Sequence, residues 1–262
     1  MKSLKIFQVD AFASAVFQGN PAAVCPLDTW LTDTQMQSIA AENNLSETVF
    51  FVPQGEGFHI RWFTPNEEIA LCGHATLAAA YILFDHLGFN GSKLIFSSLS
   101  GELIVQKTAQ GLVMDFPELP YHEIELTPQW QSLNLKRPAQ VFKSRFDLMF
   151  VYGDAADVQE AHPDLNAVAA LDYRGLILTA PGINTDIYSR CFYPGCDVPE
   201  DPVTGSAHCV IAPFWCERLA KPEVTARQGG KRQGELSCVV KAGRVLLYGT
   251  CHLYLEGIIH LS

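Results

Sequence analysis

The sequence predicts an α+β protein made of two copies of one unit, each a curled, mostly antiparallel sheet around a central helix. Short segments typical of strands dominate the chain. Three short motifs of the first half recur in the second half, in the same order and at nearly the same spacing. Each half also has one helix that is apolar on nearly every side, and such a helix must be surrounded by other elements.

The repeats carry the prediction of two units. RWFTP at 61–65 is echoed by RCFYP at 190–194, an offset of 129 residues. Gly73, which opens an apolar helix, recurs as Gly205 at an offset of 132, and a GEL motif recurs at an offset of 133. Three matches in order favour duplication of one unit. Prolines among acidic residues mark the connection between the units. We therefore expect domains at 1–117, completed by a C-terminal strand at about 250–262, and at 118–249.

Local patterns predict the elements of each unit. Strands are expected at 4–9, 47–53, 57–63 and, in two or three pieces, from 93 to 116. Thr32 and Gln35 have the spacing of a capping box, which predicts a helix to about Glu42. Apolar residues on nearly every side predict a buried helix over 73–87, and a second apolar helix is expected from 205 to about 219.

Composition and charge exclude several classes of function. The 262 residues are 48% apolar and 18% charged, as in a well-packed globular protein. The net charge of -10 opposes binding to nucleic acid or to anionic lipid. No segment has the length of a membrane span, and the N-terminal residues lack a signal-peptide core. We therefore expect a cytoplasmic protein without nucleic-acid or membrane partners.

The eight cysteines are expected to be reduced thiols. They contain no CxxC pair, and the eight histidines are scattered without a zinc-binding spacing. Disulfides are typical of short exported chains, which this sequence does not resemble. The sequence therefore predicts neither a disulfide framework nor a metal site.

The starts of the two apolar helices form the first candidate site. A helix start presents unpaired backbone N–H groups, so Gly73 and Gly205 could bind a carboxylate without basic side chains. A cleft between the units would then hold a small anionic substrate, flanked by Cys72, Thr204 and Ser206. The structural alternative is that both glycines are turn residues, Ser206 is an N-cap and Cys72 is a small buried apolar residue.

Two further residues are candidates for proton transfer. Glu47 stands at the edge of an almost wholly apolar strand, where partial burial would favour its neutral form and suit it to move a proton. The alternative is a surface glutamate at a strand start. His74 lies at the mouth of the first apolar helix, where it is either an acid/base or a structural histidine.

Several motifs together resemble the PhzF-like isomerases of phenazine biosynthesis, which share the diaminopimelate epimerase fold. The motifs are GNP at 19–21, NLSET at 44–48, FTP at 63–65, CGHATL at 72–77 and EDPVTGSA at 200–207. They span nearly the whole chain in the right order. The resemblance implies two pseudo-symmetric domains, no cofactor and a homodimer, which is also the commonest assembly of such enzymes.

The resemblance also implies roles for particular residues. It places the acid/base glutamate on Glu47, with His74 and Asp201 as further catalytic groups. Ser206 and the backbone of Gly73 and Gly205 would bind the substrate. The expected reaction moves a proton between carbons of a small, cyclic or amino-acid-like carboxylate.

Two alternatives remain open at this stage. Cys72 stands where racemases and epimerases of this fold have a catalytic thiol, so a Cys72-centred epimerase or hydroxyproline-type dehydratase is one. The matching place in the second half holds Thr204, which is no strong second base and disfavours symmetric thiol racemisation. The other alternative is a small-molecule binding protein that kept the fold and lost the chemistry.

Overall fold

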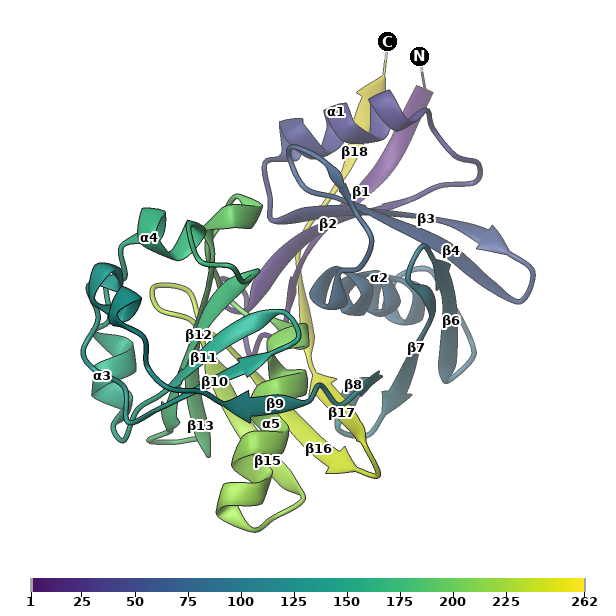
Figure 1. Cartoon of the computed structure of the whole chain (residues 1–262). Coiled ribbons are helices and arrows are strands. Elements are labelled where there is room, and N and C mark those ends of the chain that lie inside the picture. Colours follow the sequence, from purple (N-terminus) through teal and green to yellow (C-terminus); the bar gives the residue numbers. More distant parts are fainter. Residues whose placement is uncertain (1, 262) are drawn as a thin grey trace. The chain divides into compact units, whose positions relative to one another are not determined.

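A computed structural model describes residues 2–261, and the chain divides into two compact units (Figure 1). Unit 1 comprises the residues up to Asp115 together with those from Tyr248 onward, and unit 2 comprises Phe116–Leu247. Each unit has the predicted α+β architecture, with a mostly antiparallel sheet and few helices. Among the described residues, no helix is long and apolar enough to cross a membrane.

Unit 1 contains a curled sheet. Its strands are β1 (Lys2–Ala11), β2 (Asn20–Pro26), β3 (Glu47–Gln54), β4 (Gly57–Phe63), β5 (Glu68–Ile69), β6 (Lys93–Ser98), β7 (Gly101–Thr108), β8 (Gly111–Pro117) and β18 (Cys251–Leu261). Neighbouring strands follow the order β18, β1, β2, β3, β4, β6, β7, β8, and β5 adds to β4. Only the β2–β3 and β4–β6 pairs among these are parallel.

The helix α2 (Gly73–Asp85) lies inside the curve of this sheet and packs against β1, β2, β3, β7 and β18 (Figure 1). It is buried on nearly every side, as predicted, and ends two residues before the predicted 87. Burial of Leu77, Ile82 and Phe84 contributes about 2 kcal/mol for each side chain. This exceeds the few tenths of a kcal/mol that separate most helix propensities, so packing rather than propensity stabilises the helix.

A second helix, α1 (Asp33–Asn43), covers the other face of β3. Thr32 caps it, the predicted capping box with Gln35 is present, and Asn44 ends it in a left-handed conformation. Met36 and Ile39 of α1 share an apolar cluster with Phe50 of β3. Side chains alternate along a strand, so the face opposite Phe50 carries Glu47 and is turned toward α2.

Unit 2 repeats the plan of unit 1. Its strands are β9 (Tyr121–Glu123), β10 (Gln140–Ser144), β11 (Asp147–Val151), β12 (Gly175–Pro181), β13 (Ile187–Tyr193), β14 (Val198–Asp201), β15 (Glu223–Gln228), β16 (Gly234–Lys241) and β17 (Arg244–Gly249). Its short helices are η1 (Pro128–Leu133), α3 (Ala155–Gln159), α4 (Leu165–Ala169) and η2 (Pro194–Cys196). The pairs β11–β12 and β13–β15 are parallel, as are β2–β3 and β4–β6 in unit 1.

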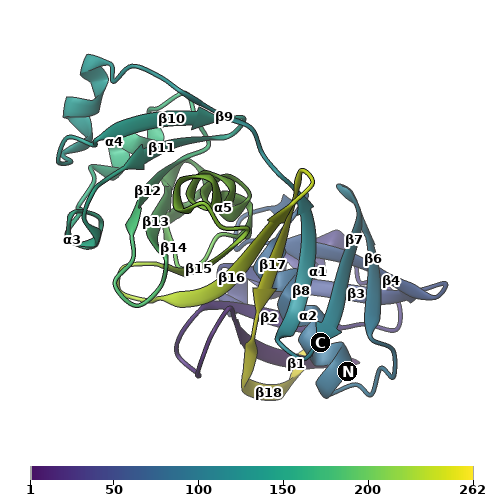
Figure 2. The ribbon, with the colours of Figure 1, turned by 90° about the horizontal axis from the view of Figure 1, so that it is seen from below.

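The central helix of unit 2 is α5 (Gly205–Leu219), which confirms the second predicted apolar helix. Figure 2 looks nearly along it, with β12, β13, β15 and β16 curving round it. Pro213 has no N–H to donate within the helix, so the carbonyl of Cys209 is free of its usual partner. That carbonyl instead accepts a hydrogen bond from the N–H of Leu119, 3.0 Å away, which attaches the start of unit 2 to its central helix.

The repeated motif has the same structure in both units. Arg61 binds Glu68 through two hydrogen bonds of 2.7 and 2.6 Å, and Arg190 binds Glu200 through two of 2.7 and 2.8 Å. Each guanidinium also lies over the phenylalanine two residues further on, at 5.2 and 5.0 Å. The shared contacts support the duplication inferred from the sequence.

We predict that His208 makes folding sensitive to acid. It is fully buried in α5, its Nδ1 lies 2.9 Å from the carbonyl oxygen of Thr204, and burial lowers its pKa to about 4. Below pH 6.5, the ordinary pKa of a histidine being about 6.5, His208 binds a proton in the unfolded chain but not in the folded chain. The free energy of unfolding should therefore fall by about 3 kcal/mol between pH 6.5 and 4.

The test is chemical denaturation at a series of pH values for His208→Thr. Thr76 occupies the equivalent place in α2 and bonds the carbonyl of Cys72, so threonine fits this site chemically. The slope of unfolding free energy against pH should decrease by about one proton in this variant. The exposed His122→Thr should keep the wild-type slope. An unchanged slope in His208→Thr would contradict the prediction.

Candidate active site

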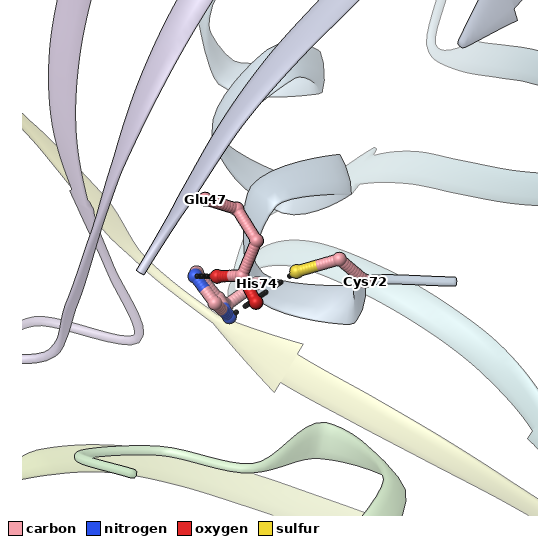
Figure 3. Close-up of side chains that lie close together, drawn as sticks. All are labelled: Glu47, Cys72 and His74. Atoms are coloured by element: carbon pink, nitrogen blue, oxygen red, sulfur yellow. Dashed lines mark hydrogen bonds and ion pairs between the residues drawn. The ribbon is translucent and has the colours of Figure 1, made fainter. Parts of the chain in front are cut away.

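Glu47 and His74 form a buried ion pair in unit 1 (Figure 3). Glu47 is the first residue of β3, and His74 is the second residue of α2. The Oε2 atom of Glu47 lies 2.9 Å from Nε2 of His74, and the two residues are only 8% and 6% exposed. Glu47 is therefore not the surface glutamate that the sequence left as an alternative.

The other ring nitrogen of His74 also has neighbours. Its Nδ1 lies 3.2 Å from Nδ2 of Asn20, which is fully buried, and 3.5 Å from Sγ of Cys72. The residue before Asn20 must be glycine. Gly19 has a φ of +66°, and a Cβ on it would lie 2.1 Å from the carbonyl oxygen of Ala11. Gly19 thereby lets the chain turn so that Asn20 reaches His74. In the sequence this GNP segment is identified only as one of the family motifs, so Asn20 is a site residue that sequence analysis misses.

The charges of this group follow from its burial and its neighbours. Burial alone lowers the pKa of His74, but hydrogen bonds to Cys72 and Glu47 and the negative charge of Glu47 leave it well above its usual range. Burial is the main cause that raises the pKa of the Cys72 thiol to about 11, and the charge of Glu47 adds to it. Cys72 is thus a thiol at neutral pH, and the Glu47 carboxylate keeps the proton on His74.

The two helix starts contradict two parts of the structural alternative, namely that Ser206 is an N-cap and that Gly73 and Gly205 are turn residues. Thr204 rather than Ser206 holds the N-cap position of α5, and Cys72 holds that of α2, without a capping side-chain hydrogen bond in either case. Ser206 is half-buried in the first helical turn, so the N-cap interpretation was wrong. Gly73 and Gly205 each begin a helix and neither is left-handed, so they are not turn glycines.

A hydrogen-bond network orders the candidate residues of unit 2. Gln228, fully buried at the end of β15, accepts from the N–H of Thr204 at 3.0 Å and donates to the carbonyl oxygen of Asp201 at 2.8 Å. These two backbone partners fix which way the amide points. Gln228 also donates to Oγ1 of Thr204 at 2.9 Å, and Oγ1 in turn donates to Oδ2 of Asp201 at 2.5 Å. Nothing near Asp201 in the sequence indicated Gln228.

Strand register shows that the two units carry their acidic groups at different places. Phe63 and Phe192 are equivalent positions of the repeated motif. Phe63 pairs with Thr48, and Phe192 pairs with Leu176. The residue before each partner is therefore also equivalent, so Gly175 of unit 2 stands in the place of Glu47. A Cβ on Gly175 would lie 2.1 Å from the ring of Tyr193, which occupies that space. The same comparison applies to Asp201, which pairs with Cys191. The equivalent of Cys191 in unit 1 is Trp62, which pairs with Ile69, so unit 1 has an isoleucine in place of Asp201.

Glu47, Cys72 and His74 together could also hold a metal ion. Each offers one ligand atom, the three atoms lie within 4.8 Å of one another, and all three residues are buried. The sequence predicted no metal site, because these residues do not follow a metal-binding spacing. They meet only because the start of β3 lies beside the start of α2 (Figure 3).

We predict that Gln228 and Thr204 act as one energetic unit. Gln228→Leu leaves a buried N–H and a buried carbonyl without their partner, which should cost about 2–4 kcal/mol of unfolding free energy. Thr204→Val removes the hydroxyl from the same network, so the double variant should lose at least about 1 kcal/mol less than the sum of the single losses. Denaturant unfolding of the four proteins measures this, with exposed Gln110→Leu as a neutral control. Additive losses would show that the network is not coupled.

Comparison with known proteins gives consistent matches over the whole chain. The family model PhzC-PhzF, described as phenazine biosynthesis-like protein, matches residues 9–257. An uncharacterized isomerase of Pseudomonas aeruginosa is 46% identical over 259 residues, covering 99% of both chains. The crystal structure of a PhzF-family phenazine biosynthesis protein from Enterococcus faecalis has a TM-score of 0.96 at 44% identity, covering 99% of this chain and 100% of that one.

A more distant structure shares the fold alone. The crystal structure of a probable proline racemase from Agrobacterium radiobacter has a TM-score of 0.61 at 10% identity, and the match covers 99% of this chain and 93% of the other. The predicted epimerase-like architecture is therefore confirmed as a fold.

Proposed function

The chain belongs to the PhzC-PhzF family of phenazine biosynthesis-like isomerases, and we propose that it moves a proton within a small carboxylate-bearing substrate without a cofactor. The substrate class is a cyclic or amino-acid-like carboxylate. Glu47 is the acid/base, with His74 and Asp201 as further catalytic groups. The observation that carries the proposal is the buried pair of Glu47 and His74, 2.9 Å apart.

The chemistry of this pair suits proton transfer at carbon. Removing a proton next to a conjugated or carbonyl group requires a base near the carbon and a positive or N–H group near the developing anion. The charged form of His74 places a positive charge 2.9 Å from the carboxylate of Glu47, the group that accepts the proton in this proposal. Glu47 can then return a proton, either the same one or one exchanged with solvent, to another carbon of the substrate, so the reaction needs no oxidant, reductant or second substrate.

Substrate binding in this proposal uses backbone groups. The starts of α2 and α5 offer N–H groups for a carboxylate, at Gly73 and at Gly205 beside the hydroxyl of Ser206. This mode suits a chain with a net charge of -10. Asp201, held by Thr204 and Gln228, is the acceptor for a substrate N–H or O–H.

A Cys72-centred epimerase or dehydratase is the second candidate. The distance of 3.5 Å between the Cys72 sulfur and Nδ1 of His74 favours it, because an imidazole at that distance can activate a thiol. Two observations weigh against it. Burial raises the pKa of Cys72 to about 11, and Thr204, the equivalent of Cys72 in unit 2, donates its hydroxyl to Asp201 instead of serving as a base. A binding protein without chemistry is the third candidate.

Glu47→Gln should abolish catalysis and leave the fold intact, because the amide keeps the shape of the side chain and cannot accept the proton. The assay is a proton-NMR screen of small cyclic and amino-acid carboxylates in heavy water, following loss of a C–H signal. We expect exchange to fall at least about a hundredfold in Glu47→Gln. The exposed Glu56→Gln in the β3–β4 turn should exchange at the wild-type rate. Undiminished exchange in Glu47→Gln would overturn the role of Glu47, and no exchange with any compound would favour the binding protein.

Alkylation separates the leading proposal from the second candidate. Cys72 is a buried thiol, whereas Cys196 is exposed, so iodoacetamide should label Cys196 and leave both Cys72 and the activity unchanged. Peptide mapping by mass spectrometry locates the label. Selective labelling of Cys72 with loss of activity would instead support the thiol mechanism.

A further inference from the structure

The group of Glu47, Cys72 and His74 combines three kinds of ligand at one buried point. A carboxylate oxygen, an imidazole nitrogen and a sulfur lie within 4.8 Å of one another (Figure 3). In a tetrahedral zinc site the ligand atoms are about 3.5 Å apart. Side-chain rotations that move the ligand atoms by about an ångström would therefore bring all three into contact with one ion. The three residues come from the starts of β3 and α2, which the sheet and the enclosed helix hold side by side.

The charge of the group also matches a divalent cation. Burying a carboxylate and a thiolate together is costly without compensating positive charge. A cation of charge +2 bound to both, with a neutral imidazole as the third ligand, makes the buried set neutral. Two protons leave to solvent as the metal bonds form, one from the thiol of Cys72 and one from the charged imidazole of His74, so the two positive charges that the cation brings are balanced.

The two ring nitrogens of His74 have different neighbours. Nε2 faces the carboxylate of Glu47 at 2.9 Å. Nδ1 lies 3.5 Å from the sulfur of Cys72 and 3.2 Å from Nδ2 of Asn20, which is fully buried.

We propose that Glu47, Cys72 and His74 form a binding site for one thiophilic divalent cation of the zinc class. Sulfur and imidazole ligands favour Zn²⁺ and Co²⁺ over Mg²⁺ and Ca²⁺, which prefer oxygen. Three protein ligands leave a fourth position for water. Binding rests on the geometry alone. One consequence rests on the proposed function. Because Glu47 is the base in that function, a cation bound to its carboxylate blocks proton transfer.

The probe is Co²⁺, titrated into the metal-free full-length protein under reducing conditions. We expect a thiolate-to-cobalt charge-transfer band that saturates at one ion per chain, is displaced by Zn²⁺, and is unaffected by excess Mg²⁺. Cys72→Ser should lose the band. Glu47→Gln and His74→Asn should each weaken binding at least about tenfold.

The matched control is Cys196→Ser, which removes the exposed thiol of unit 2 and should keep the full band. Absence of the band in the wild type, its persistence in Cys72→Ser, or its loss in Cys196→Ser would each overturn the proposed site. Circular dichroism checks that Cys72→Ser is folded, and Cys72→Ala replaces it if it is not. Cobalt binding that leaves proton exchange intact would keep the metal site and reject Glu47 as the base.

Discussion

Enclosure of a helix that has no polar face is the constraint on which each unit depends. Ten of the thirteen residues of α2 are buried, so strands must surround it rather than pack on one side. The sheet therefore curls, and β3, covered by α1 on its other face, is buried on both sides. A charged residue at the start of β3 that points toward α2 then has little access to water. Glu47 occupies this position, and His74 in the first turn of α2 supplies the compensating charge.

The duplication reproduces the backbone and the structural contacts but not the chemistry. Both units repeat the strand directions and the arginine–glutamate pair, which stabilise the fold wherever it occurs. The reactive groups do not repeat, because Gly175 stands in place of Glu47 and Ile69 in place of Asp201. Two identical units would offer two equal bases, as a symmetric racemase needs. Two divergent units suit a reaction in which one carboxylate carries the proton.

The parts of the fold that follow from local sequence were predictable. The capping box at Thr32, the two apolar helices and the repeated motifs all depend on residues a few positions apart. The site was predictable only in part. Glu47 and His74 were identified as candidates, but their contact joins two separate elements. Asn20 and Gln228 were missed, because they reach their partners across 54 and 24 residues and have no local signature. Such contacts arise only when the strands pair.

The strand β18 belongs to unit 1 although it is made after the whole of unit 2. It pairs with β1 over the full length of both strands, and β1 in turn holds β2, which carries Asn20. During synthesis unit 2 is a continuous segment that can fold as soon as it leaves the ribosome, since domains fold as units. Unit 1 must wait, with its β1 edge exposed, until residues 251–261 emerge. Unit 1, which carries Glu47 and His74, is therefore completed after unit 2, and synthesis that stops before residue 251 leaves unit 2 complete and the β18-facing edge of β1 unpaired.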